Sequence, residues 1–274
     1  MALAELEAGP SHDLVRQALR AIGCMEHRGG GVGETGDGAG LLLRPERDFY
    51  EPFITRGRRL DEGELLMVGC VFMLAGERNV RELQREIDLI LRRQGLQPLG
   101  WRAVPTRIEA LGALARDDAP RVFQVLVGRG HRLEAQLPGV LAFVRRHIED
   151  TMAAVHVPAL SARTTVYKAL CTGPQLAEFY PDLSDPALTT RLVLGHRRFA
   201  TNTFSNWHLV QPFRFLAHNG EINTIRATTR AVRDVQTPLG VQRVLMRHGS
   251  DSAQLDRAVE LLATTRANGL AVAA

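Results

Sequence analysis

The stretch GHRRFATNTFSNWHLVQPFRFLAHNGEINT, residues 195–224, concentrates polar side chains between segments of ordinary apolar patterning: three Arg, three His, four Asn and one Trp. The spacing of its apolar residues predicts a strand over 192–197, an irregular loop, and a second strand over 213–217. A turn at 218–220 then leads into a helix from position 221. Polar side chains gathered where strands end more often form a functional site than an ordinary solvent-exposed surface. We therefore expect a functional site in this stretch.

The composition is that of a globular protein, with 274 residues, 45% hydrophobic and 23% charged. No apolar run is long enough to span a bilayer and the N-terminus lacks a signal pattern, so we expect a cytoplasmic protein without a membrane partner. The net charge is +4, but the basic residues are interspersed with acids and aromatics are only 5%. This pattern argues against a nucleic-acid partner.

Two motif-like features are rejected as cofactor sites. The three cysteines, Cys24, Cys70 and Cys171, lie far apart and never approach CxxC spacing, so no metal site or iron–sulfur cluster is expected within this chain. A formal GxGxxG match begins at Gly31, but the predicted order is helix, loop, strand rather than the strand, loop, helix of a dinucleotide site. Those glycines are expected to serve tight turns and close backbone approach.

The remaining periodicity predicts helices alternating loosely with strands, which favours a layered α+β fold in one domain over 1–274. Ser11 is expected to cap the first helix, Asn79 and Glu82 to form a capping box, and Ser252 to cap the last helix, whose Leu255 and Val259 face inward with Leu262. Helices are predicted at 11–25, after Pro45, and at 79–91, 137–155, 174–179, 223–235 and 252–263, and strands at 40–44, 65–74, 101–104, 122–127 and 161–170.

Seven segments occur in a recognisable order: EHRG, TGDGAG, LSARTTVYK, EFYPDL, HRRFATNTFSNW, QPFRFLAHNGEINT and GSDSAQLDRAVELL. Together they resemble the glutamine amidotransferase domain of the glutamate synthase large subunit, which is a class II, N-terminal-nucleophile amidotransferase. The resemblance is close over about 11–44 and 161–262 and loose between them. It implies a four-layer αββα fold and hydrolysis of glutamine to glutamate and ammonia.

The resemblance also implies residue roles, and the chemistry of glutamine fits them, since its α-carboxylate, α-ammonium and side-chain amide need a cation, an anion and an oxyanion hole. Arg198 matches the family's carboxylate anchor, with a planar guanidinium suited to that task. Asp251 matches the partner of the α-amino group. A surface salt bridge for Arg198 and a helix cap for Asp251 are the structural alternatives.

Asn219 and Gly220 match the family's oxyanion-hole pair, one side-chain amide and one backbone N–H. Asn-Gly is also an ordinary turn dipeptide, so the neighbouring residues carry the assignment. Arg28 corresponds to an arginine beside the family's nucleophile. The remaining predicted substrate contacts are Phe199, Thr201 and His218, and Trp207 is expected either to shape the pocket or to belong to the core.

The sequence departs from the family pattern at two places. Arg197 stands at the second position of the family's H-S-R-F motif. The family's nucleophile is an N-terminal cysteine whose own amine acts as the base, and counting back from Arg28 puts it at or just before Met1. Cys24 lies inside a predicted helix and cannot replace it. We therefore expect a domain incomplete at both ends and inactive as written.

The leading functional hypothesis is the glutaminase domain of a glutamate synthase, supplying ammonia for transfer to 2-oxoglutarate in glutamate biosynthesis. The alternative is a non-catalytic protein that binds glutamine or docks on a synthase. A third possibility, service to purine or amino-sugar synthesis, is disfavoured by EFYPDL and FATNTFSNW. The resemblance places FMN and an iron–sulfur cluster in the partner synthase region, and we expect no cofactor or metal within this chain.

Overall fold

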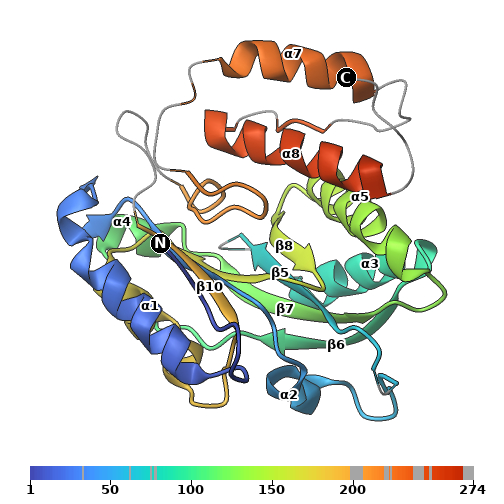
Figure 1. The fold of residues 1–274 in the computed structure, drawn as a ribbon, viewed down its shortest axis with the longest axis horizontal. Coiled ribbons are helices and arrows are strands. Elements are labelled where there is room, and N and C mark those ends of the chain that lie inside the picture. Colours follow the sequence, from blue (N-terminus) through green and yellow to red (C-terminus); the bar gives the residue numbers. More distant parts are fainter. Residues whose placement is uncertain are drawn as a thin grey trace.

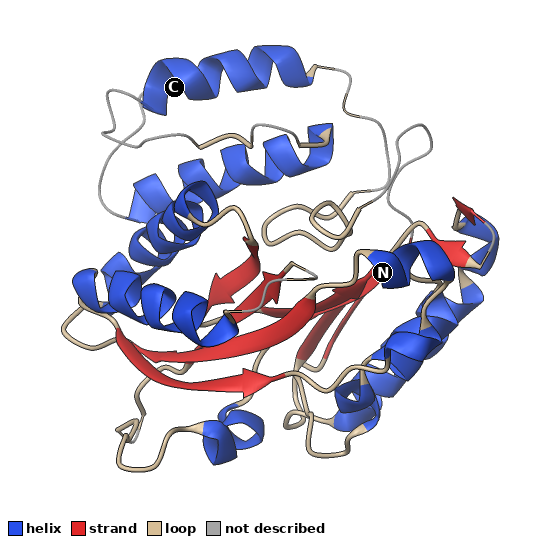
Figure 2. Ribbon diagram, turned by 180° about the vertical axis from the view of Figure 1, so that it is seen from behind, coloured by secondary structure: helices blue, strands red, loops and turns tan. Residues whose placement is uncertain are grey.

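The computed structural model describes residues 1–32, 34–61, 63–74, 76, 79–197, 206–218, 222, 224–236, 244–246 and 249–267. These residues form two four-stranded antiparallel sheets with helices on their outer faces (Figures 1 and 2). The first sheet has the order β1 (Ala2–Ala4), β10 (Leu192–Arg197), β4 (Ala39–Leu43) and β9 (Thr165–Ala169). The second has the order β6 (Gln97–Ala103), β7 (Arg121–Gly128), β5 (Met67–Met73) and β8 (Val155–Ser161).

The side chains of strand β5 point alternately to the two faces of the second sheet and so contact two different layers. Its Val68 and Phe72 belong to the apolar cluster shared with the first sheet, whereas its Met67 and Val71 belong to the cluster shared with the helices outside the second sheet. Helices α1 (His12–Cys24) and α6 (Gly173–Phe179) cover the first sheet, and α3 (Val80–Arg93) and α5 (Leu137–Thr151) cover the second. The predicted four-layer αββα architecture is confirmed.

Short elements complete the sandwich. They are a hairpin of β2 (Gly31–Val32) and β3 (Thr35–Gly36), helices α2 (Arg47–Tyr50) and α4 (Ala113–Asp117), and 3-10 turns at Glu26–Arg28, Glu51–Phe53, Ile108–Ala110, Glu134–Gln136 and Pro181–Ser184. A side chain at Gly36 would overlap the backbone of Cys171. The close approach expected of the glycine run is therefore real at this position.

Most predicted elements in the sandwich are confirmed within a few residues, and Ser11 caps α1 by accepting the backbone N–H of Leu14 at 3.4 Å. Two predictions are wrong. Strand β8 begins at Val155, which had been placed at the end of a helix, because α5 stops at Thr151. The capping box is also not formed, since the Asn79 amide donates to the Glu82 carboxylate and no side-chain cap bond reaches the backbone.

Beyond the sandwich, α7 (Ile225–Gln236) and α8 (Asp251–Ala267) stack above α5 (Figure 1). Two predictions about α8 are wrong. Ser250, not Ser252, places its side-chain oxygen on the N–H of Ala253 at the start of the helix. Its buried face includes Asp256, Arg257 and Glu260, whereas Leu262 is 45% exposed and Leu255 and Val259 are only partly buried. Polar residues can occupy the inward face because the neighbouring loop offers charged and backbone partners.

The segment 206–218 crosses between α8 and the strands as an irregular loop (Figures 1 and 2). A strand was predicted over 213–217 and is not formed. The N–H groups of Phe215 and Leu216 donate to the carboxylate of Asp256, at 2.7 and 3.1 Å, rather than to a neighbouring strand. Of residues 213–217 only Phe213 is buried, and Phe215 is 46% exposed, so the apolar pattern over 213–217 does not mark one buried face of a strand.

Candidate active site

A pocket of about 350 Å³ opens where β1 and β10 end beside the loop 206–218. The chain's first residue forms one wall: the Met1 amine donates to the carbonyl of Gly195 at 2.9 Å, and the Gly195 N–H donates to the carbonyl of Met1 at 2.9 Å. The described lining residues are Met1, Ala2, Met25, Leu194, Gly195, His196, Arg197, Ala217 and His218. Residues from four separate segments of the chain thus line one concave site, as is common in binding pockets.

Arg197, which the sequence showed only as a departure from the family motif, is the best-anchored side chain of this pocket. Its buried guanidinium donates to Glu26 at 2.8 and 3.1 Å, to Asp37 at 2.6 Å, and to the carbonyl of Gly38 at 3.2 Å. The side chain therefore binds the segment that contains Arg28 to the loop around Asp37. Nothing in the local sequence indicates these partners.

The electrostatics around Arg197 are those of a paired, buried charge. The hydrogen bond from Arg197 lowers the pKa of the Glu26 carboxyl, although burial opposes this, and the N–H of Gly173 adds a second donor at 2.7 Å. A side chain at Gly29 would overlap the guanidinium of Arg197. The glycine of EHRG is thus required for the arginine to lie where it does.

His218 is a predicted substrate contact that the structure places in the pocket wall. Its Nε2 lies 2.7 Å from Oγ of Ser252, near the start of α8. Asp251, the predicted partner of the α-amino group, is the first residue of α8 and is exposed. It is one residue away from Ser252 but is not among the described lining residues. Its role in binding stays a prediction.

The other predicted site residues lie outside the described part of the structure: they are Arg198, Phe199, Thr201, Asn219 and Gly220, together with the side chain of Arg28. The described residues that directly precede them in the chain show where these segments begin. Arg197 and His218, which precede the two undescribed segments, both line the pocket. The chain therefore enters each of these segments from the pocket wall.

Trp207 is a core residue. It is 4% exposed, its indole N–H donates to the carbonyl of Ala115 at 3.2 Å, and its ring lies against Phe72 and Phe179. Of the two roles that the sequence left open, packing is the one that the structure supports.

The cysteines are consistent with the expectation of structural thiols at two positions. Cys70 and Cys171 are buried, and burial raises the pKa of the Cys70 thiol to about 12 and that of Cys171 as well. Cys24 is exposed on α1. No group of metal-ligating side chains lies among the described residues, and their helices include none with the length and apolar character to cross a membrane.

Comparison with known proteins defines the class of this fold and pocket. The sequence profile of the glutamine amidotransferases class-II matches residues 2–273. The chain therefore belongs to the class II glutamine amidotransferases.

Individual relatives are similar across nearly the whole chain. Ferredoxin-dependent glutamate synthase 2 of Synechocystis sp. is 36% identical over 288 residues, which cover 96% of this chain and 18% of that protein. The glutamate synthase [NADPH] large chain of Bacillus subtilis is 34% identical, with 94% of this chain and 18% of that protein covered. Ferredoxin-dependent glutamate synthase 1 of Arabidopsis thaliana is 34% identical, covering 95% and 17%. The chain thus spans less than a fifth of these relatives' length.

Proposed function

We propose that this chain belongs to the glutaminase domain of a glutamate synthase, the type of domain that hydrolyses glutamine to glutamate and ammonia for transfer to 2-oxoglutarate. The observation that carries the proposal is the pocket beside Met1 and Gly195, in a chain of this family, with Arg197 and His218 in its wall. The names of the glutamate synthase relatives support the choice of pathway.

The proposed chemistry divides the substrate among the predicted residues. Arg198 binds the α-carboxylate, Asp251 binds the α-ammonium, and Asn219 with Gly220 donates hydrogen bonds to the oxyanion that forms during attack on the amide. Arg28 lies beside the nucleophile. Phe199, Thr201 and His218 complete the substrate contacts.

In this proposal the attacking group is a thiol at the start of the first strand, whose own amine accepts its proton. The Met1 amine marks the place, since it lies at the pocket wall within hydrogen-bonding distance of Gly195. A polypeptide of residues 1–274 has a Met thioether there, which cannot attack an acyl carbon. We therefore propose that such a polypeptide does not hydrolyse glutamine.

We further propose that the remaining polypeptide of a glutamate synthase is the partner, and that FMN and an iron–sulfur cluster belong to that part. The oxidoreductase role in nitrogen assimilation and a cytoplasmic location follow from the same proposal. A second candidate is a non-catalytic glutamine-binding or synthase-docking protein. The observation that favours this candidate is that no cysteine is among the described residues that line the pocket.

Calorimetric titration with glutamine tests binding. Residues 1–274 are expected to bind glutamine, and Arg198→Ala to weaken binding by roughly 2–3 kcal/mol through loss of charge-assisted hydrogen bonds. Arg230→Ala, on an exposed position of α7, is the matched control and should bind as the wild type does. Equal binding by Arg198→Ala would show that this residue is not the carboxylate anchor.

Glutamate release from glutamine separates the two candidates. The enzyme hypothesis predicts that extending the chain at both ends, with a processed N-terminal cysteine, brings hydrolysis, whereas residues 1–274 remain inactive. Turnover by residues 1–274 comparable to that of the extended form would mean that Cys24, Cys70 or Cys171 acts as the nucleophile. Binding without turnover in both forms would favour the non-catalytic candidate.

A further inference from the structure

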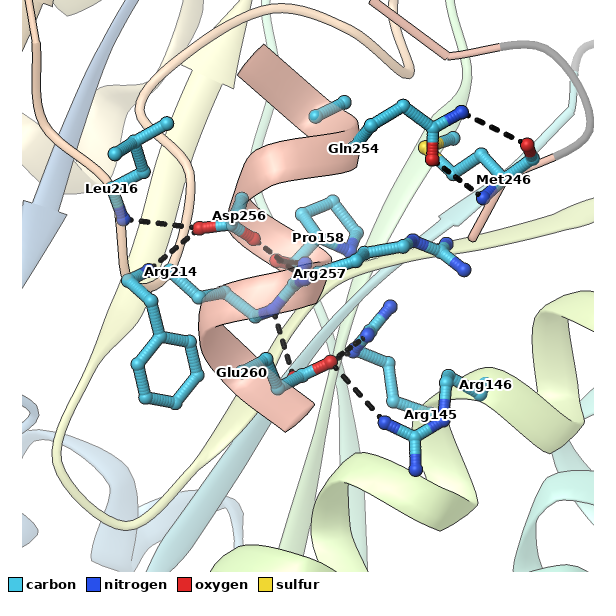
Figure 3. Close-up of polar contacts among 12 residues, drawn as sticks. Arg145, Arg146, Pro158, Arg214, Leu216, Met246, Gln254, Asp256, Arg257 and Glu260 are labelled. Atoms are coloured by element: carbon cyan, nitrogen blue, oxygen red, sulfur yellow. Dashed lines mark hydrogen bonds and ion pairs between the residues drawn. The ribbon is translucent and has the colours of Figure 1, made fainter. Parts of the chain in front are cut away.

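Three polar residues lie on one face of α8, at intervals of four positions: Ser252, Asp256 and Glu260. Here they are called the polar face of α8. Each contacts a residue of the segment 214–218, which continues directly into Asn219 and Gly220 in the sequence. Figure 3 shows the contacts of Asp256 and Glu260. An amphipathic surface helix normally turns apolar residues inward, so a buried polar face needs a specific explanation.

Asp256 is the centre of this face and is 1% exposed. One carboxylate oxygen accepts the N–H groups of Phe215 and Leu216, and the other lies 2.7 Å from a guanidinium nitrogen of Arg214. The carboxylate thus supplies the acceptors that a neighbouring strand would otherwise provide. Three consecutive residues of the loop are held by a single side chain of α8.

Glu260 holds the same segment from one turn further along the helix. It accepts from Nε of Arg214 at 3.2 Å and also pairs with Arg145 of α5. Burial opposes ionisation, but Arg145 and Arg214 lower the pKa of Glu260 to about 2, so the carboxylate is charged at neutral pH. The polar face of α8 is therefore itself fixed against α5, and through it against the second sheet.

At the other end of the face, Ser252 lies 2.7 Å from His218, which is in the pocket wall. Asp251, the predicted anchor for the α-amino group, is the adjacent residue of the same helix. One rigid helix thus carries a predicted substrate anchor and holds the backbone that leads to the predicted amide-binding pair.

We propose that the polar face of α8, with Asp256 at its centre, is a positioning device that determines recognition of the glutamine side-chain amide. The inference rests on the proposed function and adds residues to it: Asp256, Glu260 and Ser252 act through the segment 214–218 rather than on substrate. Catalytic and binding groups must be held within a fraction of an ångström by such supporting contacts.

The test compares glutamine with L-norvaline, which keeps the α-amino and α-carboxylate groups and the carbon chain but lacks the amide. Affinities for both ligands are measured by calorimetry on residues 1–274. The wild type is expected to bind glutamine at least about tenfold more tightly. Asp256→Ala should reduce this preference at least about fivefold while leaving the norvaline affinity nearly unchanged. The reason is that the predicted amide-binding pair follows the segment 214–218, whereas Arg198 and Asp251, the predicted anchors of the groups that norvaline keeps, lie outside it.

Gln254→Ala is the matched control. Gln254 lies on the same helix and also makes two hydrogen bonds to backbone, accepting from the N–H of Met246 at 3.1 Å and donating to its carbonyl at 3.0 Å (Figure 3). Its partner is in a different segment, so the glutamine preference should remain that of the wild type. Asp256→Asn, which keeps an oxygen acceptor for both N–H groups, should restore most of the preference.

If Asp256→Ala does not fold, Ser252→Ala carries the test, with an expected loss of about threefold in the glutamine preference. A purely structural role would weaken both ligands equally, and an unchanged preference in folded Asp256→Ala and Ser252→Ala would overturn the inference while leaving the proposed function intact. A wild-type chain that binds norvaline as tightly as glutamine would overturn the proposed function, and this inference with it.

Discussion

The sandwich and the α8 region are held together by different forces. Between the sheets, the contacts are mainly apolar, through side chains such as Leu41, Val68 and Phe72, each at most 1% exposed. A buried ion pair, Arg102 with Asp182, also lies there and is hydrogen-bonded to Gln124 and Tyr167. Under α8, buried contacts run through Asp256 and Glu260 with arginines from two other segments, α5 and the loop 206–218. Apolar packing depends on volume and is insensitive to charge, whereas a buried ion-pair network fails when one member is lost. The site is built at the boundary between the two regions.

The largest effect is expected from Glu260→Ala. It leaves Arg145 and Arg214 buried with fewer anionic partners, and removing one partner of a buried pair costs roughly 3–5 kcal/mol. Denaturant unfolding at pH 7 measures the loss. Glu109→Ala, at an exposed position, should change the free energy of unfolding by no more than about 0.5 kcal/mol. A loss below about 1 kcal/mol for Glu260→Ala would show that the network is not a major source of stability.

Leu41→Ala probes the sandwich. Leu41 is fully buried in β4, and truncation of a core leucine costs about 3 kcal/mol through lost burial and a residual cavity. Unlike the loss in Glu260→Ala, this loss should be the same at pH 7 and pH 4. The control is Leu89→Ala, since Leu89 is 52% exposed on α3. A Leu41→Ala loss that varies with pH would contradict the division into two regions.

The same division explains which structural features the sequence could predict. Strand β10 is found at the predicted residues, 192–197, and its alternate residues Val193, Gly195 and Arg197 are buried. The strand predicted over 213–217 is not formed: Phe215 is 46% exposed, and the N–H groups of Phe215 and Leu216 donate to Asp256. A periodic apolar pattern in the sequence does not say which group accepts the hydrogen bonds of the backbone N–H groups. Strand β8 was missed because its apolar residues follow α5 with no strong turn signal between them.

The candidate site also contains residues that the sequence could predict and residues that it could not. His218 was predicted as a substrate contact from the family pattern of the HNG segment; it lies in the pocket wall, and its contact with substrate stays a prediction. The role of Arg197 could not be predicted, since its partners Glu26 and Asp37 lie 171 and 160 positions away in the sequence. Long-range ion pairs leave no local pattern. The assignments of Arg198, Asn219 and Gly220 stay predictions because those residues are outside the described part of the chain.

Gly29→Ala tests the contacts of Arg197 without changing the arginine itself. A methyl group at this position overlaps the guanidinium of Arg197, so the arginine must shift away from Glu26, at an expected cost of roughly 2 kcal/mol in the free energy of unfolding. The matched change is Gly23→Ala in α1, where nothing lies within 4 Å of the new atom. That variant should be neutral or slightly stabilised, because alanine favours a helix. Equal stability of the two variants would show that Arg197 relocates freely.

The smallest effect concerns Lys168, which joins the two regions. It belongs to β9 of the sandwich, and its buried ammonium donates to the carbonyls of Val210 and His208, at 2.7 and 3.4 Å, in the loop under α8. Burial lowers the pKa of Lys168 to about 8, against roughly 10.4 for an unfolded lysine. Between these values the unfolded chain binds more protons at this site than the folded chain. The contribution to stability therefore rises with pH across this window.

Lys168→Met removes this dependence while preserving most of the side-chain volume. The difference in unfolding free energy between wild type and variant is expected to shift in favour of the wild type by about 1.6 kcal/mol from pH 8 to pH 9.5. Titration of other groups is common to both proteins and cancels in the difference. A flat difference would mean that Lys168 keeps an ordinary pKa and is hydrated. A shift in favour of the variant would mean that the carbonyls of the loop stabilise the ammonium more than burial destabilises it, so that the boundary behaves as part of the charged region.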